Sequence, residues 1–221
     1  MSDERLIQEA HRVYRRYQSE IVEGFRLCPW AERSRSEGHV SERVLLASEL
    51  DTEATLAVAG KLADDENVHI GILIFPRLKT TWLEFERFVS RTLAEDARRR
   101  ELGTAPFAMA AFHPEAPCDT TTNQRLIPFL RRTPDPVIQL VRMRLLDEVR
   151  RGQSDGTQFM DLSRIDIADV LAKASTPTLR ERIAKANMET VCQTGVEKFT
   201  DKLSELKRDR DESYQELGEP T

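Results

Sequence analysis

Cysteine is scarce in this sequence. The 221 residues contain three cysteines, Cys28, Cys118 and Cys192, which lie far apart along the chain. Small disulfide-stabilised domains carry several cysteine pairs, and structural zinc sites usually contain a Cys-x-x-Cys pair, which is missing here. We therefore expect reduced thiols and neither a disulfide framework nor structural zinc.

The chain also lacks a surplus of positive charge and a long apolar run. Lysine and arginine total 33 against 38 aspartates and glutamates, a net charge of -5, so general nucleic-acid binding is not expected. The longest apolar run, residues 68–75, is far shorter than the ~20 residues that span a bilayer, and the first residues are polar, unlike a signal peptide. We expect a cytoplasmic protein with no membrane partner that acts on a small-molecule substrate; a homo-oligomer is compatible with the sequence.

Two common catalytic signatures are missing as well. The sequence contains no glycine-rich phosphate loop and no Gly-x-Ser-x-Gly motif. The first absence counts against a P-loop nucleotide site and the second against an α/β-hydrolase. Candidate chemistry therefore rests on cysteine, histidine and arginine side chains.

Helical and strand patterns alternate through the first part of the chain. Residues 6–25 and 81–100 repeat apolar side chains at helical spacing, whereas residues 68–75 and 106–112 are short apolar runs typical of buried strands. The alternation predicts an α/β (α+β) fold, with a layered sheet of about three to four strands packed by helices and a helical C-terminal extension.

We divide the chain into three parts. Residues 1–152 form an α/β core with the candidate site, residues 153–206 a helical region packing on it, and residues 207–221 a charged, flexible tail. Residues 137–150 allow two interpretations. Asp135 as N-cap and Pro136 in the first turn favour a helix, which we prefer, while the apolar start also suits a strand leading into a short helix.

The first candidate for chemistry is Cys28, which is followed by Pro29. The proline holds Cys28 out of helical geometry, so the sulfur would project from a rigid turn as a thiolate ligand or a nucleophile. The alternative, given equal weight, is a small buried side chain at the end of a helix.

The second candidate, His113, precedes Pro114 at the end of a predicted strand, where ligands of open α/β sheets gather. Its imidazole suits a metal ligand or an acid–base group, although a histidine hydrogen-bonded to backbone is slightly favoured. The third is Arg131-Arg132, next to a turn with two prolines. A guanidinium held there suits a carboxylate; the alternative is a surface arginine paired with nearby acids.

Together these motifs resemble a bacterial family catalogued only as a domain of unknown function. The family shows Leu-Cys-Pro-aromatic-Ala, Phe-His-Pro and Arg-Ser-Pro-x-Pro before an apolar segment ending in arginine. The matching residues are Leu27-Cys28-Pro29-Trp30-Ala31, Phe112-His113-Pro114, Arg132-Thr133-Pro134-Asp135-Pro136 and Arg142, with a further likeness around Asn187 and Gly195. The chain departs from the pattern at Trp30 and Thr133, where phenylalanine and serine are usual.

The order of these motifs is also distantly similar to haem-dependent N-oxygenases that act on amino-acid nitrogens. That resemblance implies haem iron bound by His113, Cys28 as an alternative ligand or pocket residue, and Arg131 and Arg132 at a propionate. Our leading hypothesis is accordingly a haem-binding oxidoreductase. The alternatives are a cofactor-free cysteine enzyme, in which Cys28, His113 and Arg132 act on an anionic substrate, and a non-catalytic binding protein.

Overall fold

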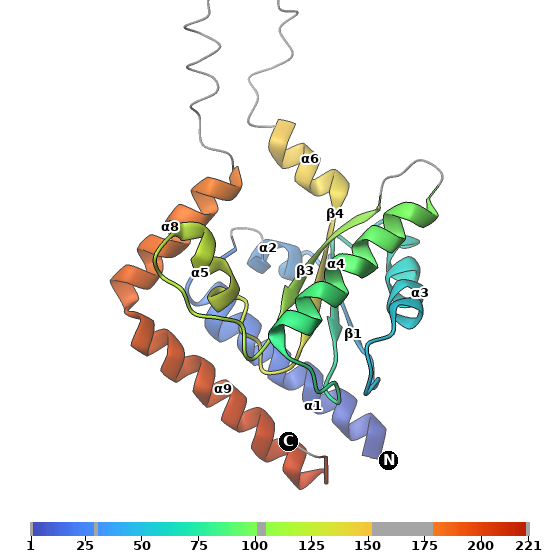
Figure 1. Cartoon of the computed structure of the whole chain (residues 1–221), viewed down its shortest axis with the longest axis horizontal. Coiled ribbons are helices and arrows are strands. Elements are labelled where there is room, and N and C mark those ends of the chain that lie inside the picture. Colours follow the sequence, from blue (N-terminus) through green and yellow to red (C-terminus); the bar gives the residue numbers. More distant parts are fainter. Residues whose placement is uncertain (1, 29–30, 101–104, 152–178, 220–221) are drawn as a thin grey trace, which may run out of the picture.

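The computed structural model describes residues 2–28, 31–100, 105–151 and 179–219 of the chain (Figure 1). The strands are β1 (Val40–Val44), β2 (Ile70–Ile74), β3 (Phe107–Phe112) and β4 (Val137–Arg142). The α-helices are α1 (Ser2–Tyr17), α2 (Ala31–Ser36), α3 (Thr52–Ala63), α4 (Trp82–Arg99), α5 (Asn123–Leu130), α6 (Met143–Arg151), α8 (Leu179–Thr194) and α9 (Val196–Glu216), and the π-helix η1 (Gln18–Glu23) extends α1. None of these helices has the length and apolar character needed to cross a membrane.

The four strands form one mixed sheet in the order β1-β2-β4-β3. Strand β1 runs parallel to β2, while β4 runs antiparallel to both β2 and β3. Strands β1, β2 and β3 therefore run in the same direction, and their carboxyl ends lie at the same end of the sheet. The predicted layered α/β sheet of about three to four strands is confirmed.

Helices cover both faces of the sheet (Figure 1). Helices α3 and α4 pack on one face around Leu73, Phe85 and Ile138, whereas α1, α5, α8 and α9 lie on the other. Every residue of β2 is buried because the strand has a neighbour on each side and helices above and below. The core on the α1 face includes Tyr17, Ile72, Leu126, Phe129, Val191, Phe199, Leu206 and Tyr214.

Helix α4 begins where its sequence places a capping box. The Thr81 hydroxyl accepts a hydrogen bond from the Glu84 amide, and the Glu84 carboxylate accepts one from the Thr81 amide at 3.0 Å. Helix α3 begins in a related way, because the Asp51 carboxylate accepts a hydrogen bond from the Ala54 amide at 3.0 Å. The exposed Glu84 side chain thus marks the start of the helix.

The preferred helix over residues 137–150 is wrong at its start. Residues 137–142 form strand β4, which inserts between β2 and β3, and the helix begins only at Met143. The N-cap signals favour a helix locally, but β4 forms backbone hydrogen bonds with a strand on each side, and these decide the conformation. The strand ends at Arg142, a buried arginine whose guanidinium donates to the backbone carbonyls of Leu62, Val68 and Asp65.

The predicted flexible tail is also wrong for most of its length. Helix α9 continues to Glu216, and Tyr214, inside the predicted tail, is completely buried. Three charges of the predicted tail pair with other elements: Asp209 with Arg12 and Arg16, Arg210 with Asp135, and Glu219 with Arg77. The predicted region 153–206 is described from residue 179 onward, where α8 and α9 pack on the α/β core.

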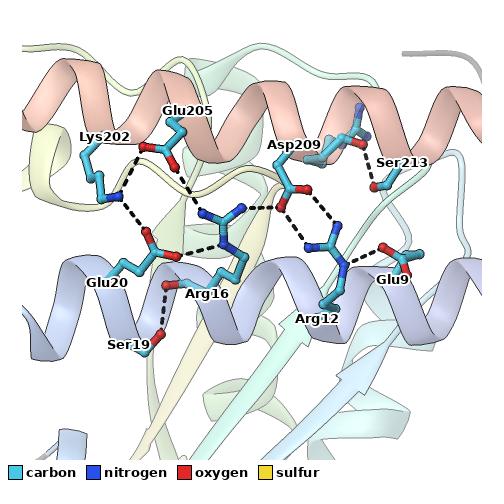
Figure 2. A network of polar contacts seen from close by, with 10 residues as sticks. Glu9, Arg12, Arg16, Ser19, Glu20, Lys202, Glu205, Asp209 and Ser213 are labelled. Carbon is cyan, nitrogen blue, oxygen red and sulfur yellow. Dashed lines mark hydrogen bonds and ion pairs between the residues drawn. The ribbon is translucent and has the colours of Figure 1, made fainter.

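Salt bridges hold α9 along α1 (Figure 2). Asp209 accepts from both terminal nitrogens of Arg12, at 2.9 and 3.0 Å, and from Arg16 at 2.7 Å. About two turns earlier on α9, Lys202 pairs with Glu20 at 2.9 Å and with Glu205 at 3.1 Å. Arg16 also binds Glu20 and Glu205, so the charges form a continuous network rather than isolated pairs.

Candidate functional site

His113 is buried at the carboxyl end of β3, with both ring nitrogens bound to backbone groups. Nε2 lies 3.0 Å from the carbonyl oxygen of Thr80, and the Glu115 amide donates to Nδ1 at 3.1 Å. The tautomer with its proton on Nε2 satisfies both contacts. The ring also packs near Trp82 and Phe85 of α4. Burial lowers the pKa of His113, and the bond to Thr80 only partly offsets this.

Arg131 and Arg132 lie beside His113, as expected. The His113 amide donates to the carbonyl oxygen of Arg131 at 3.0 Å, which fixes the end of α5 against the end of β3. The Arg132 guanidinium lies over the ring of Phe129 at 5.0 Å, and its Nε donates to the Ala116 carbonyl at 2.5 Å. Arg132 is thereby held in a fixed orientation.

Cys28 lies on the other side of the sheet. It is half-buried and follows Leu27, a member of the core under α1. Burial raises the pKa of Tyr14, and the nearby groups of Tyr17, Glu42 and Cys28 raise it further, which places the thiol beside α1. The rest of the predicted motif, Pro29 and Trp30, falls outside the described residues.

The three candidates therefore do not converge on one site. The backbone joins His113 to Arg131, but the His113 ring contacts α4 on one face of the sheet. The Arg132 guanidinium lies over Phe129 on the opposite α1 face, which is also the face of Cys28. His113 has other partners on both ring nitrogens, so it does not accept a proton from Cys28 in this arrangement. A cysteine–histidine dyad needs that contact.

The turn from Thr133 to Pro136 is held by a buried ion pair. Asp135, buried at 3% exposure, accepts from Arg210 Nε at 2.9 Å and from the Tyr214 hydroxyl at 2.7 Å. Burial raises the pKa of the Asp135 carboxyl, opposed by the positive charge of Arg210. The Thr133 hydroxyl closes the turn by donating to the Asp135 carbonyl. The Pro-Asp-Pro turn and helix α9 are thus one rigid unit.

A small pocket of about 80 Å³ opens between this turn and α9. The core side contributes Arg132, whose guanidinium is oriented as above, and α9 contributes Lys207. The remaining lining residues are Pro114, Thr133, Pro134, Thr200, Leu203 and Ser204. Two cationic side chains and three hydroxyl-bearing residues therefore surround a space large enough for a small polar group.

Comparison with known protein families gives one match. Residues 9–161 match the family described as "Protein of unknown function (DUF1415)". The chain belongs to this family. The match covers most of the chain, including Cys28, His113 and Arg132, and confirms that the chain belongs to a family of unknown function. Searches of curated proteins and of solved structures returned no significant match.

The DUF1415 match ends before α8 and α9, so it contains only half of the pocket. Sequence reasoning does not find the half on α9: Lys207 falls in the predicted flexible tail, and Thr200, Leu203 and Ser204 fall in a region predicted to be helical without any role in a site. A usable signal exists, since Phe199, Leu203, Leu206, Arg210 and Tyr214 repeat at intervals of three and four residues and lie on one face of a helix.

The residues assigned to haem in this DUF1415 member do not fit that role as they lie. Axial ligation needs an available ring nitrogen or a thiolate facing the same cavity, but both nitrogens of His113 bind backbone groups and Cys28 lies across the sheet. Within the described ranges, no group of three or more histidine, cysteine or acidic side chains could hold a metal ion.

Proposed function

We propose that this protein binds a small anionic ligand, a carboxylate or a phosphate group, in the pocket between Arg132 and Lys207. The observation that carries the proposal is the convergence of these two cations from separate elements on one small cavity. The hydroxyls of Thr133 and Thr200 already donate to the carbonyls of Asp135 and Val196, so Ser204 is the lining hydroxyl that supplies a further donor for an oxyanion.

The electrostatics of Arg132 support this function. Within the described part of the chain, no carboxylate forms a salt bridge with its guanidinium, whereas Arg12, Arg16 and Arg210, which contact or belong to α9, have acidic partners. Its one hydrogen bond from Nε to Ala116 orients the group and leaves the two terminal nitrogens for a ligand. Lys207 pairs with Asp211, and Arg210 pairs with both Asp135 and Asp211, so these four charges balance. The positive charge of Arg132 therefore gives the pocket its net positive lining.

The proposal is a binding role, and it does not rely on His113 or Cys28 as reacting groups. His113 supports the pocket indirectly: its amide fixes Arg131, and its neighbour Pro114 lines the cavity. The motif residues His113, Thr133 and Asp135 then act by positioning Arg132 rather than by chemistry.

Thermal unfolding of the full chain in inorganic phosphate, with chloride at equal ionic strength as reference, tests the proposal. A ligand that binds only the folded state raises Tm as the ligand concentration rises. At a ligand concentration of 100 times Kd, the folded state is stabilised by about 2.7 kcal/mol. We expect this rise in the wild type, a clear reduction in Lys207→Gln, and a wild-type response in Lys198→Gln, a matched change of an exposed lysine on α9. Acetate and citrate repeat the test for carboxylates.

The proposal fails if neither phosphate nor the carboxylates raise Tm beyond chloride, or if both lysine variants respond alike. The haem hypothesis from the sequence stays a prediction with its own test. It requires an absorption band in the Soret region when the protein is produced with a haem precursor, and loss of that band in His113→Ala but not in His69→Ala.

A further inference from the structure

The sheet has two edge strands of different character. Strand β1 carries Glu42 and Arg43, charges of the kind that protect an exposed edge from pairing with another chain. Strand β3, from Phe107 to Phe112, consists only of phenylalanine, alanine and methionine, with no charge, proline or glycine. The residues of this strand therefore provide none of the charged or proline side chains that usually protect an edge.

The backbone groups on the outer side of β3 can be assigned from the ladder with β4. The Met143 amide donates to the Pro106 carbonyl at 2.9 Å, and strand pairing continues from Phe107 opposite Arg142. Hydrogen-bonded residues alternate along an antiparallel strand, so even-numbered residues of β3 bond to β4. The N–H and C=O groups of Phe107, Met109 and Ala111 therefore point away from the sheet.

These outward groups have no hydrogen-bond partner within the described residues. His113, the next odd-numbered residue, differs because its outward amide has a partner and donates to the carbonyl of Arg131. The stretch with unpaired outward backbone groups thus runs from Phe107 to Ala111. It stops at His113, which pairs with the end of α5.

We propose that a second copy of this chain pairs with this edge, β3 against β3 in antiparallel orientation, to form a dimer with one continuous sheet. A two-fold axis through Met109 places Phe107 of one copy opposite Ala111 of the other and Met109 opposite itself. Each outward N–H then meets an outward C=O, giving about six backbone hydrogen bonds.

The charge pattern favours a second copy as the occupant. A two-fold pairing sets the strand against a copy of itself, so an edge with charge of one sign would repel its partner, whereas this uncharged strand does not. The contact is also short. A stable interface buries about 800 Å² per partner, more than three residue pairs supply, so the dimer is expected to be reversible and to depend on protein concentration.

Sedimentation of the full chain from about 1 μM to about 1 mM tests the dimer. We expect a shift from monomer to dimer that Met109→Pro removes, since proline deletes an outward N–H and leaves the ladder to β4 intact. Val44→Pro is the control: Leu45 donates to Ile74, so the Val44 amide points outward from the opposite edge in the same way. That variant should dimerise like the wild type.

Amide hydrogen exchange in the unmodified chain gives a second readout that needs no variant. Exchange at Phe107, Met109 and Ala111 should slow as concentration rises, while Ala108 and Ala110 are protected throughout. A chain that stays monomeric over the whole range, or a dimer unaffected by Met109→Pro, overturns the proposal. Protection of the outward amides at every concentration also overturns it, because another segment of the same chain would then cover the edge.

Discussion

Replacing Arg210 by methionine is expected to destabilise the protein by about 3–5 kcal/mol, the usual cost of removing one partner of a buried ion pair. The side chains of Asp135 and Arg210 are 3% and 12% exposed. Without Arg210 the Asp135 carboxylate keeps only the Tyr214 hydroxyl at 2.7 Å, and the Pro76 carbonyl loses its donor at 2.9 Å. An uncompensated charge in a dry turn accounts for most of the expected loss.

Urea and thermal unfolding of full-length variants measure this effect. A loss of this size corresponds to a fall in Tm of roughly 10 °C for a protein of this length. Arg208→Met, on an exposed residue of the same helix, is the control and should change stability by less than about 0.5 kcal/mol. Adding Asp135→Asn to Arg210→Met removes the stranded charge and should recover part of the loss. The reasoning is refuted if Arg210→Met costs no more than the control, or if the double variant is no more stable than the single one.

Two further substitutions test other buried contacts. Burial lowers the pKa of His113 below its unfolded value of about 6.5, so the unfolded chain binds more protons and stability should fall as pH drops below about 6.5. His113→Gln should show a shallower fall between about pH 7.5 and 5.5 in urea midpoints, and an unchanged slope would contradict the assigned role. Arg142→Lys should cost about 2 kcal/mol, because an ammonium cannot reach the several carbonyls that the guanidinium binds, and Arg144→Lys should be nearly neutral by the same measurement.

The sequence predicts those helices and strands whose apolar pattern is typical of only one kind of secondary structure. The run at β2 is apolar throughout and the face of α4 repeats at helical spacing, so both were assigned near their observed bounds. The sequence does not decide the structure of residues 137–142, since an apolar run that follows Asp135 and Pro136 satisfies the local rules for a helix and for a strand. Only the neighbouring strands, far away in the sequence, decide between them.

The candidate site is predictable to a similar extent. A histidine at a strand end and an adjoining Pro-rich turn indicated that His113 and Arg132 lie in one region, and they do. The hydrogen-bond partners of these polar groups lie outside the motifs, so the motifs do not predict them. His113 binds the Thr80 carbonyl, and Asp135 binds Arg210. Lys207 was missed because a charged residue on a helix looks solvated until the opposite surface is known.

The pairing of α1 with α9 has a consequence for biosynthesis. Helix α1 is made early, and the helix that forms salt bridges with it follows every strand of the sheet. While a ribosome is still translating residues 143–195, the α1 face of the sheet has no Phe199, Leu206 or Tyr214 to bury it. Such contacts between distant parts of a chain form slowly and leave apolar surface open in the meantime. The nascent chain is thus most exposed to aggregation in the interval before α9 emerges, and translation speed through this stretch sets how long that interval lasts.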